Sequence, residues 1–245
     1  MTMPRRAPPN RVTDIAHAAC SVFIAKGYQR ALMTDVGRNL GLSHAVLYRY
    51  VESKEALFHL ALLYATDPGA LTGLTIPMPT PPPGETLALI DKWLAGNLAY
   101  PVLAAALERD QCTDVRRELA GIVDERYAVA ERHRRFLALI ERSATDLPEL
   151  HTLYFVRSRR ENIAKLARYL HRRIESGVLR PVPDVATAAR FIVETIAWFA
   201  RHRKGDPDSE MISDDQARET VRYLVVAAFV SDSQDSAAQE ARHDQ

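Results

Sequence analysis

The amino-acid sequence predicts an all-α protein with a small N-terminal domain and a larger C-terminal helical domain. Apolar residues recur every three or four positions along most of the chain, which is the spacing of a helix face that packs against a core. Glycines or capping residues stand at most of the expected helix ends. A dense proline stretch, IPMPTPPPGE, interrupts this pattern, and we place the domain boundary just before it.

Residues 31–54, ALMTDVGRNLGLSHAVLYRYVESK, read as two short helices joined by a tight turn. The apolar residues of the first helix recur at helical spacing: Met33, Val36 and Leu40. Gly37 lies on the inner side of this helix, where the missing side chain allows a second helix to approach closely. Gly41 follows the last periodic residue, where helices often end in a left-handed conformation. This combination is typical of a helix-turn-helix, whose second helix enters the major groove of DNA.

The second helix is predicted to begin after Ser43, whose hydroxyl can accept a backbone N–H. Val46 and Leu47 can anchor this helix, which leaves its polar and aromatic side chains exposed. The same spacing also fits an ordinary helical corner with a solvated polar face, so the pattern alone leaves both interpretations open.

The segment that follows the turn favours the first interpretation. Residues 47–57, LYRYVESKEAL, resemble the TetR family of bacterial transcriptional regulators, and residues 23–28 and 35–43 look like the same family's first two helices. The resemblance covers about a quarter of the chain. It implies a DNA-binding head, a dimer and a small-molecule pocket within the C-terminal helices. The family usually has threonine at the start of the second helix, where this chain has Ala31 and Leu32, so a helix cap and a phosphate contact are expected to be missing.

Side chains of the second helix and its flanks are the predicted contacts with double-stranded DNA. His44 and Arg49 can reach base edges, because arginine can pair with both acceptors of guanine. Ala45 and Val46 can touch a thymine methyl group. The other candidates can donate hydrogen bonds to phosphates: Thr34, Ser43, Tyr48, Tyr50 and Lys54. The resemblance independently implies backbone contacts for Tyr48 and Lys54.

Composition and charge agree with a DNA-binding head on a soluble body. The whole chain carries a net charge of +1, whereas residues 1–64 hold eight lysines and arginines against four acidic residues. No apolar run is long enough to cross a membrane, and the basic N-terminus lacks the apolar stretch of a secretory signal. Cys20 and Cys112 make neither a disulfide framework nor a zinc site. We therefore expect a cytoplasmic protein without cofactor or metal.

The predicted organisation has five parts. Residues 1–10 form a mobile basic arm, and residues 11–66 form the DNA-binding domain with its linking helix. Its first helix runs from Arg11 to Lys26 with Asn10 as cap, and its last helix is capped by Ser53. Residues 67–84 form a proline-rich connector that cannot be helical. Residues 85–231 form the ligand-binding and dimerisation domain, and residues 232–245 form a disordered tail.

The C-terminal domain is predicted to consist of successive amphipathic helices. The first breaks or kinks near Pro101, and a segment over residues 113–144 breaks near Gly121. Asp146 and Glu149 resemble a capping box that opens a helix reaching Ser176. Asp184 caps the next helix, which ends near residue 204. Ser213 and Gln216 form a second capping box, which opens a helix that ends near residue 230.

The last two helices carry more apolar surface than one core can use, which favours a four-helix interface in a symmetric dimer. The candidate interface residues are Phe191, Thr195, Trp198, Phe199, Val221, Leu224, Val225 and Ala228. The alternative is a monomer in which these helices occupy the centre of one bundle.

Aromatic and isolated polar residues on inward faces of the C-terminal helices suit a mostly apolar ligand pocket. They are Trp93, Asn97, Tyr100, Tyr127, Phe136, Tyr154 and Phe155. The alternative for each of them is an ordinary core position.

The sequence contains no Gly-rich phosphate loop, no Gly-x-Ser-x-Gly elbow and no His-Glu-x-x-His helix, which are motifs typical of enzymes. We expect a dimeric repressor that binds a near-palindromic operator and is released by an unidentified small molecule. One alternative is an activator or a ligand-independent regulator of the same family. The other is a helical carrier or enzyme whose N-terminal helices are vestigial.

Overall fold

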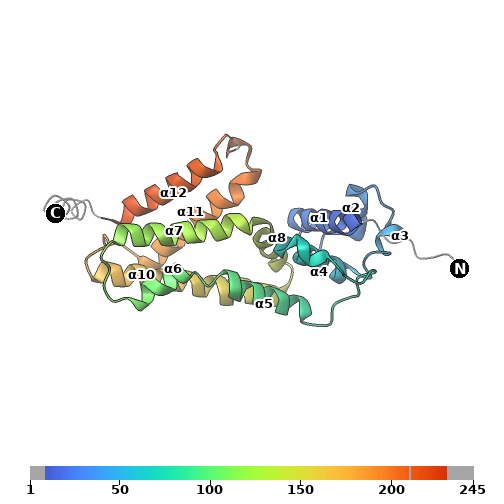
Figure 1. The fold of residues 1–245 in the computed structure, drawn as a ribbon, viewed down its shortest axis with the longest axis horizontal. Coiled ribbons are helices and arrows are strands. Elements are labelled where there is room, and N and C mark those ends of the chain that lie inside the picture. Colours follow the sequence, from blue (N-terminus) through green and yellow to red (C-terminus); the bar gives the residue numbers. More distant parts are fainter. Residues whose placement is uncertain (1–8, 210, 231–245) are drawn as a thin grey trace. The chain divides into compact units, whose positions relative to one another are not determined.

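The computed structural model describes residues 9–209 and 211–230. Over these residues the chain forms twelve α-helices, with short 3-10 turns, a π-helical segment and no named strand (Figure 1). The all-α prediction is therefore confirmed. Of the predicted arm at residues 1–10, residues 1–8 lie outside the described part of the chain, as does the predicted tail at residues 232–245. Residues 9 and 10 belong to the first helix, so the arm prediction is wrong for these two.

Contacts divide the chain into two packing units. The first unit holds the residues up to Leu94 together with Arg135–Arg157, and the second holds Ala95–Arg134 together with the residues from Ser158 onward. The division does not coincide with the boundary that the proline-rich stretch suggested, because that stretch packs with the N-terminal helices.

Four helices make up the N-terminal part of the first unit: α1 (Pro9–Lys26), α2 (Met33–Asn39), α3 (His44–Leu47) and α4 (Lys54–Thr66). Helix α1 begins at Pro9, so the expected cap at Asn10 is wrong. Proline suits a first helical turn, where its missing N–H has no intrahelical partner in any case. The core between α1 and α4 includes Phe23 and Phe58, whose rings meet edge to face at 5.1 Å.

The proline-rich connector is more ordered than predicted. It starts with a 3-10 turn, η1 (Pro68–Leu71), because the Asp67 carboxylate accepts the Gly69 N–H at 2.8 Å, so the prediction of no helix fails there. Further along, Met78 pairs with the chain between α3 and α4. Its N–H donates to the Tyr50 carbonyl at 2.8 Å, and its carbonyl accepts from Glu52 N at 3.0 Å.

The helices that follow the connector begin with α5 (Glu85–Asn97), α6 (Pro101–Glu108), α7 (Val115–Arg132) and α8 (Arg134–Ala144). The predicted break at Gly121 is wrong, because α7 continues without interruption to Arg132. Gly121 lies inside α7, and a Cβ atom there would sit 3.4 Å from the Val102 side chain. Gly121 therefore packs against α6 from the middle of α7 and does not mark a helix end.

The chain then forms α9 (Pro148–His151), the π-helical segment η2 (Thr152–Arg159) and α10 (Arg160–Glu175). The capping box expected from Asp146 and Glu149 is wrong. Leu147 is the residue before α9, it makes no side-chain cap, and the Asp146 carboxylate accepts a hydrogen bond from Gln29 instead.

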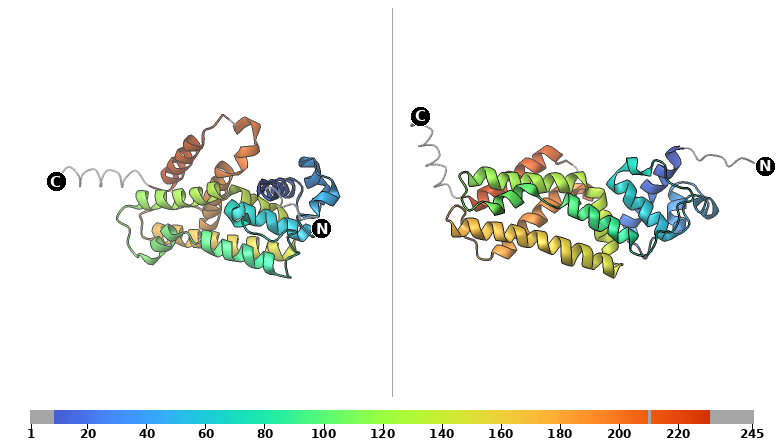
Figure 2. Two further views of the ribbon diagram at one scale, coloured as in Figure 1. Left: turned by 45° about the vertical axis from the view of Figure 1, so that its right-hand side comes forward. Right: turned by 60° about the horizontal axis from the view of Figure 1, so that its bottom comes forward.

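The last two helices are α11 (Val185–Ala200) and α12 (Asp214–Phe229), which lie side by side (Figure 2). Both predicted caps are confirmed. The Asp184 carboxylate accepts from Thr187 N at 2.7 Å, and Ser213 and Gln216 form the reciprocal box. Between the two helices the chain makes the 3-10 turns η3 (His202–Gly205) and η4 (Pro207–Ser209).

A buried ion pair connects α6, α7 and α10 inside the second unit. The Arg173 guanidinium is only 1% exposed. It donates to both Glu118 oxygens at 2.8 and 3.3 Å and to the Ala106 carbonyl at 2.9 Å. The Glu118 side chain is itself 8% exposed, so neither charge has water as an alternative partner.

Replacing Glu118 with alanine should destabilise the protein by about 3 kcal/mol, because it leaves a buried guanidinium without its counter-ion. Chemical denaturation of the wild type and the variant measures this difference. Glu161→Ala is the matched control. It breaks the exposed pair with Lys165, in which the glutamate side chain is 64% exposed, and should leave stability nearly unchanged. Equal losses of stability in the two variants would contradict the idea that burial makes the Arg173–Glu118 pair important.

Candidate nucleic-acid interface

The turn between α2 and α3 depends on backbone contact at Gly37. A Cβ atom on Gly37 would lie 2.7 Å from the Leu42 carbonyl oxygen, closer than real Cβ contacts allow. The Leu42 N–H donates to the Gly37 carbonyl at 2.8 Å, and Gly41 has a φ of +63°. Both glycine predictions are confirmed, and together they fix the direction in which the chain enters α3.

Helix α3 is a single turn that continues as a hydrogen-bonded turn to Tyr50. Leu47 is fully buried and anchors it. The Ser43 hydroxyl makes no capping bond, so that prediction is wrong; the Ser43 main-chain carbonyl instead accepts from Val46 N at 3.0 Å. The hydroxyl is therefore left at the surface.

The predicted DNA-contacting side chains are mostly on the surface of this segment. The exposed ones are Thr34, Ser43, His44, Ala45, Tyr48 and Arg49, while Val46, Tyr50 and Lys54 are half-buried. The His44 and Tyr48 rings meet edge to face at 4.8 Å, which orders two of the exposed side chains. The structure thus brings eight of the nine candidates onto α3, its flanks and the start of α4, with Thr34 on α2.

A carboxylate takes over the cap that Leu32 cannot supply. Asp35 accepts the Leu32 N–H at 3.0 Å and pairs with Lys26 at 2.7 Å. The hydrogen bond from Lys26 and the one from the Leu32 backbone lower the pKa of Asp35. The missing threonine therefore leaves the start of α2 capped from inside the helix, while Leu32 itself remains 57% exposed.

Lys54 is held within the head before any ligand binds. Its ammonium donates to the Gln29 carbonyl at 3.0 Å and lies 4.8 Å from the centre of the Tyr28 ring. The Tyr28 hydroxyl donates to Glu55 at 3.2 Å. Burial lowers the pKa of Lys54, while Glu55 and Asp146 oppose that shift. The first turn of α4 is thereby tied to the turn that precedes α2.

The same turn is bound from the other side by the segment after α8. Gln29 N donates to Asp146 at 3.0 Å, and Arg142 donates to the Lys26 carbonyl at 3.3 Å. A Cβ atom on Gly27 would lie 2.5 Å from the Asp146 carboxylate, and Gly27 has a φ of +82°. Only glycine fits this approach. Sequence reasoning missed these contacts, because no local pattern relates residues more than a hundred positions apart.

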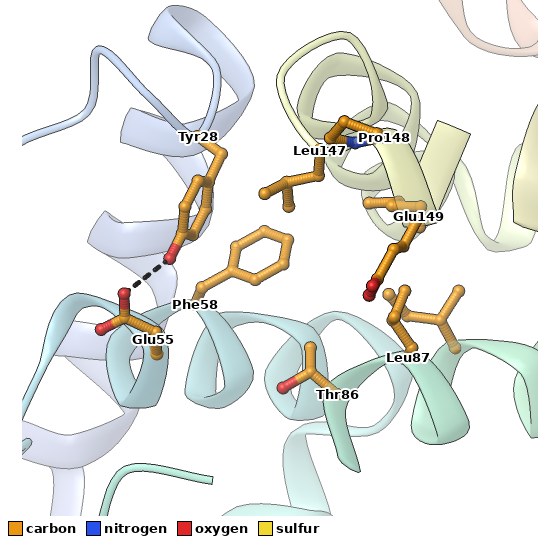
Figure 3. A pocket seen from close by; sticks show the side chains of 10 residues that line it. Tyr28, Glu55, Phe58, Thr86, Leu87, Leu147, Pro148 and Glu149 are labelled. Atoms are coloured by element: carbon orange, nitrogen blue, oxygen red, sulfur yellow. Dashed lines mark hydrogen bonds between the residues drawn. The ribbon is translucent and has the colours of Figure 1, made fainter. Parts of the chain in front are cut away.

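A cavity of about 420 Å³ lies beside these contacts, within the first unit (Figure 3). We call it the head cavity. Its lining comes from the turn before α2 and from α4, α5 and α9: Tyr28, Glu55, Phe58, Thr86, Leu87, Ile90, Leu147, Pro148, Glu149 and Leu150. None of the seven residues predicted to form a ligand pocket lines it. Four separate segments supply the walls, so periodicity within one helix gives no sign of it.

The seven predicted pocket residues are divided between the two units. Trp93, Phe136, Tyr154 and Phe155 belong to the first unit, where the Trp93 and Phe136 rings touch with centroids 4.0 Å apart. Asn97, Tyr100 and Tyr127 belong to the second. There Tyr127 is fully buried, and Tyr100 lies 4.2 Å from the guanidinium of Arg126.

The eight candidate interface residues also differ in exposure. Phe191, Trp198 and Leu224 are 57%, 40% and 58% exposed, and Ala228 is exposed as well. Thr195 and Phe199 are half-buried. Val221 and Val225 are buried in the core of their own chain, each 2% exposed, so they have no area left for a partner. Tyr223, which is not among these eight residues, is 67% exposed.

The described residues form neither a metal site nor a membrane-spanning helix. No group of three or more His, Cys, Asp or Glu side chains there could hold a metal ion. No helix there is long and apolar enough to span a bilayer.

The Asp35 contacts predict a specific pH dependence. The pKa of Asp35 is lowered on folding, so its stabilising contribution is complete above the unfolded value of about 3.9 and disappears as the pH falls through the folded value. Asp35→Asn should reduce stability at neutral pH, and the gap to the wild type should shrink as the pH falls below about 4. Urea denaturation from pH 7 to pH 3 measures the gap. The control Asp208→Asn, an exposed carboxylate, should show no comparable gap at neutral pH.

Comparisons with known proteins agree with the geometry. Residues 15–61 match the sequence model of the bacterial regulatory proteins of the tetR family. No curated protein sequence matches the chain. Among solved structures, the ketosteroid transcriptional regulator KstR2 of Mycobacterium tuberculosis is 15% identical, with a TM-score of 0.54 over 91% of this chain and 96% of that one.

Two further solved structures share the fold. The TetR family transcriptional regulator PfmR from Thermus thermophilus is 24% identical, with a TM-score of 0.50 over 86% of this chain and 94% of that one. AibR in complex with isovaleryl coenzyme A and operator DNA is 14% identical, with a TM-score of 0.51 over 88% and 98%. Residues 15–61 thus match the DNA-binding region of the tetR family, and the chain shares its fold with these solved regulators.

Proposed function

We propose that the protein is a dimeric repressor that binds a near-palindromic operator through α3 and is released by a small molecule. The observation that carries the proposal is the exposed polar face of α3 and its flanks, held by the glycine contacts at Gly37 and Gly41. A dimer bound across a promoter blocks polymerase without any further contact, which makes repression the simplest consequence of this geometry.

In the N-terminal helices, His44 and Arg49 would contact the DNA bases, because both are exposed on the segment that would enter the major groove. Phosphate contacts fall to the donors around it, namely Thr34, Ser43, Tyr48, Tyr50 and Lys54. In a dimer the two recognition segments would lie about 34 Å apart, one turn of B-DNA. Such binding should weaken with rising salt concentration, since phosphate contacts release counter-ions.

Two substitutions separate base reading from phosphate binding. Arg49→Ala should relax the preference for one base pair at a cost of about 1–3 kcal/mol, whereas Lys54→Ala should weaken binding to all sequences alike and reduce the salt slope by about one. Gel-shift titrations with the protein's own upstream region and with single-base variants of it measure both effects. An equal loss of base preference in the two variants would contradict these roles, and binding independent of salt and sequence would contradict the proposal as a whole.

Dimerisation would use an apolar stripe on α11 and α12. On α11, Ala188, Phe191, Thr195 and Trp198 recur at spacings of three and four residues, and on α12 Leu224 and Ala228 do the same. Phe191, Trp198 and Leu224 together expose large apolar side chains that a monomer would leave in water. A two-fold arrangement of these helices covers them and holds two heads in a fixed spacing.

The double variant Phe191→Glu/Leu224→Glu should be a monomer, because each dimer would bury four carboxylates against apolar side chains. Sedimentation velocity gives the oligomeric state, and the variant should also lose the tight operator complex. Met211→Glu is the control, since Met211 is 94% exposed and lies off the stripe. A wild-type protein that sediments as a monomer, or a variant that remains a dimer, would contradict this interface.

The ligand response is supported by the solved AibR complex, which pairs isovaleryl coenzyme A with operator DNA in a protein of similar fold. In this chain the residues first expected to form the pocket are split between two packing units, and the rings of Trp93 and Phe136 contact each other. A ligand acts only through its preference for the conformation that does not bind DNA. Reporter expression from the operator, with and without candidate ligands, tests this part.

A further inference from the structure

We propose that the head cavity binds an apolar organic cation, an amine joined to an aromatic or aliphatic body, and that this ligand acts on Lys54 through Tyr28. The proposal rests on the ligand response proposed above and adds its place and its chemical class. The cavity volume of about 420 Å³ falls in the range of about 300–1,000 Å³ that is typical of small-molecule sites.

The walls of the head cavity are mainly apolar. Phe58 projects toward its centre from α4, and Leu147 faces Phe58 from the segment before α9 (Figure 3). Leu87 and Ile90 complete the wall on the side of α5. A ligand therefore gains affinity from an apolar body of modest size, in contact with at least one aromatic ring.

The charged groups that line the head cavity are the carboxylates of Glu55 and Glu149, which are hydrogen-bond acceptors. The Tyr28 hydroxyl already donates to Glu55 at 3.2 Å. The Thr86 hydroxyl lies 2.9 Å from His59 Nδ1, a buried neighbour whose pKa is lowered by burial. Glu149 is exposed at the rim, and its carboxylate turns toward the side of Leu87 (Figure 3). A ligand must therefore bring the donor.

The charges around the head cavity also favour a ligand that carries a positive charge. The ten lining residues include two glutamates and neither lysine nor arginine. Around them, Lys54 is engaged with Gln29, and the adjoining groove that Glu149 shares adds Asp91 and Arg157, one charge of each sign. The surroundings remain negative overall, which disfavours an anion. Aromatic faces and a carboxylate together suit an ammonium group.

The cavity walls are also the parts that hold the turn before α2. Tyr28 belongs to that turn, and its ring lies 4.8 Å from the Lys54 ammonium. Leu147 and Pro148 follow Asp146, whose carboxylate holds Gln29 N. A ligand seated between Phe58, Leu147 and Glu149 would therefore touch Tyr28, which contacts Lys54. It would also touch the segment after Asp146, which holds Gln29. Ligand affinity and operator affinity are then linked. The bound ligand should change operator affinity by about fivefold to tenfold, which is within the usual range of allosteric coupling.

Calorimetry on the full chain without DNA tests the ligand class. The probes are 4-phenylbutylamine, 4-phenylbutanol and 4-phenylbutyrate, which share one apolar body and differ in charge. The amine should bind at least about tenfold more tightly than the alcohol, and the carboxylate should bind most weakly. Equal binding of amine and alcohol, or no binding of the amine at millimolar concentration, would overturn the proposal.

Three variants locate the bound amine. Glu149→Gln should weaken amine binding about fivefold, as expected for an exposed charge pair, and leave alcohol binding unchanged. Glu108→Gln, an exposed glutamate on α6, is the matched control and should change neither. Leu87→Trp should fill the cavity and abolish binding. Circular dichroism checks that this variant folds, and Glu149→Gln decides the question if it does not. Identical affinities in Glu149→Gln and Glu108→Gln would place the amine elsewhere.

Gel shifts with and without the amine separate this proposal from the proposed function. Operator binding that weakens about fivefold in the presence of amine supports both. A protein that binds the amine but no operator would overturn the proposed function alone. A protein that binds the operator but not the amine would overturn the cavity proposal alone. Amine binding without any change in operator affinity would overturn the link to Lys54.

Discussion

The backbone contact between Gly37 and Leu42 is the constraint on which the helix-turn-helix of α2 and α3 depends. A side chain as small as alanine's would meet the Leu42 carbonyl at 2.7 Å, so α2 and the entry to α3 approach as closely as their main chains allow. Because the Leu42 N–H is bonded back to the Gly37 carbonyl, the turn cannot open without losing a hydrogen bond. This contact sets the angle at which α3 faces outward, and that angle exposes the side chains proposed to contact DNA.

Around that contact the head is held by polar bonds from distant parts of the chain. Asp35 caps α2 from within, and Asp146 fixes the turn before it. Met78, from the proline-rich connector, pairs with the chain on either side of Val51. The head is thus stabilised by the segments that follow it as well as by its own small core. A change in the segment after α8 is therefore passed directly to the turn before α2, through the hydrogen bond between Asp146 and Gln29.

Much of this architecture can be predicted from the sequence, where local chemistry decides the outcome. The caps at Ser53, Asp184 and Ser213 form as expected, because a short polar side chain before a helix satisfies a free N–H wherever the rest of the chain lies. The predictions that failed share a different cause. Asp146 was expected to cap the helix that follows it, but its carboxylate accepts a hydrogen bond from the distant backbone N–H of Gln29. Gly121 was expected to break a helix and instead lies inside α7, where it faces Val102 of α6. The head cavity has walls from four segments, so tertiary packing alone creates it.

Lys54 illustrates how a contact made before binding shapes binding itself. An ammonium group has three N–H donors, and the bond to the Gln29 carbonyl uses one of them, which leaves two for an incoming oxyanion. The side chain has also given up its rotamer freedom in advance, a loss of up to about 2 kcal/mol that a freely moving lysine would suffer only on meeting DNA. The flat, rigid fork of an arginine could not keep the same carbonyl and ring contacts while presenting its remaining donors outward. If Lys54 binds a DNA phosphate as proposed, its side chain is positioned in advance, and loss of its contacts with Gln29 and Tyr28 would weaken the DNA complex without any change in the lysine itself.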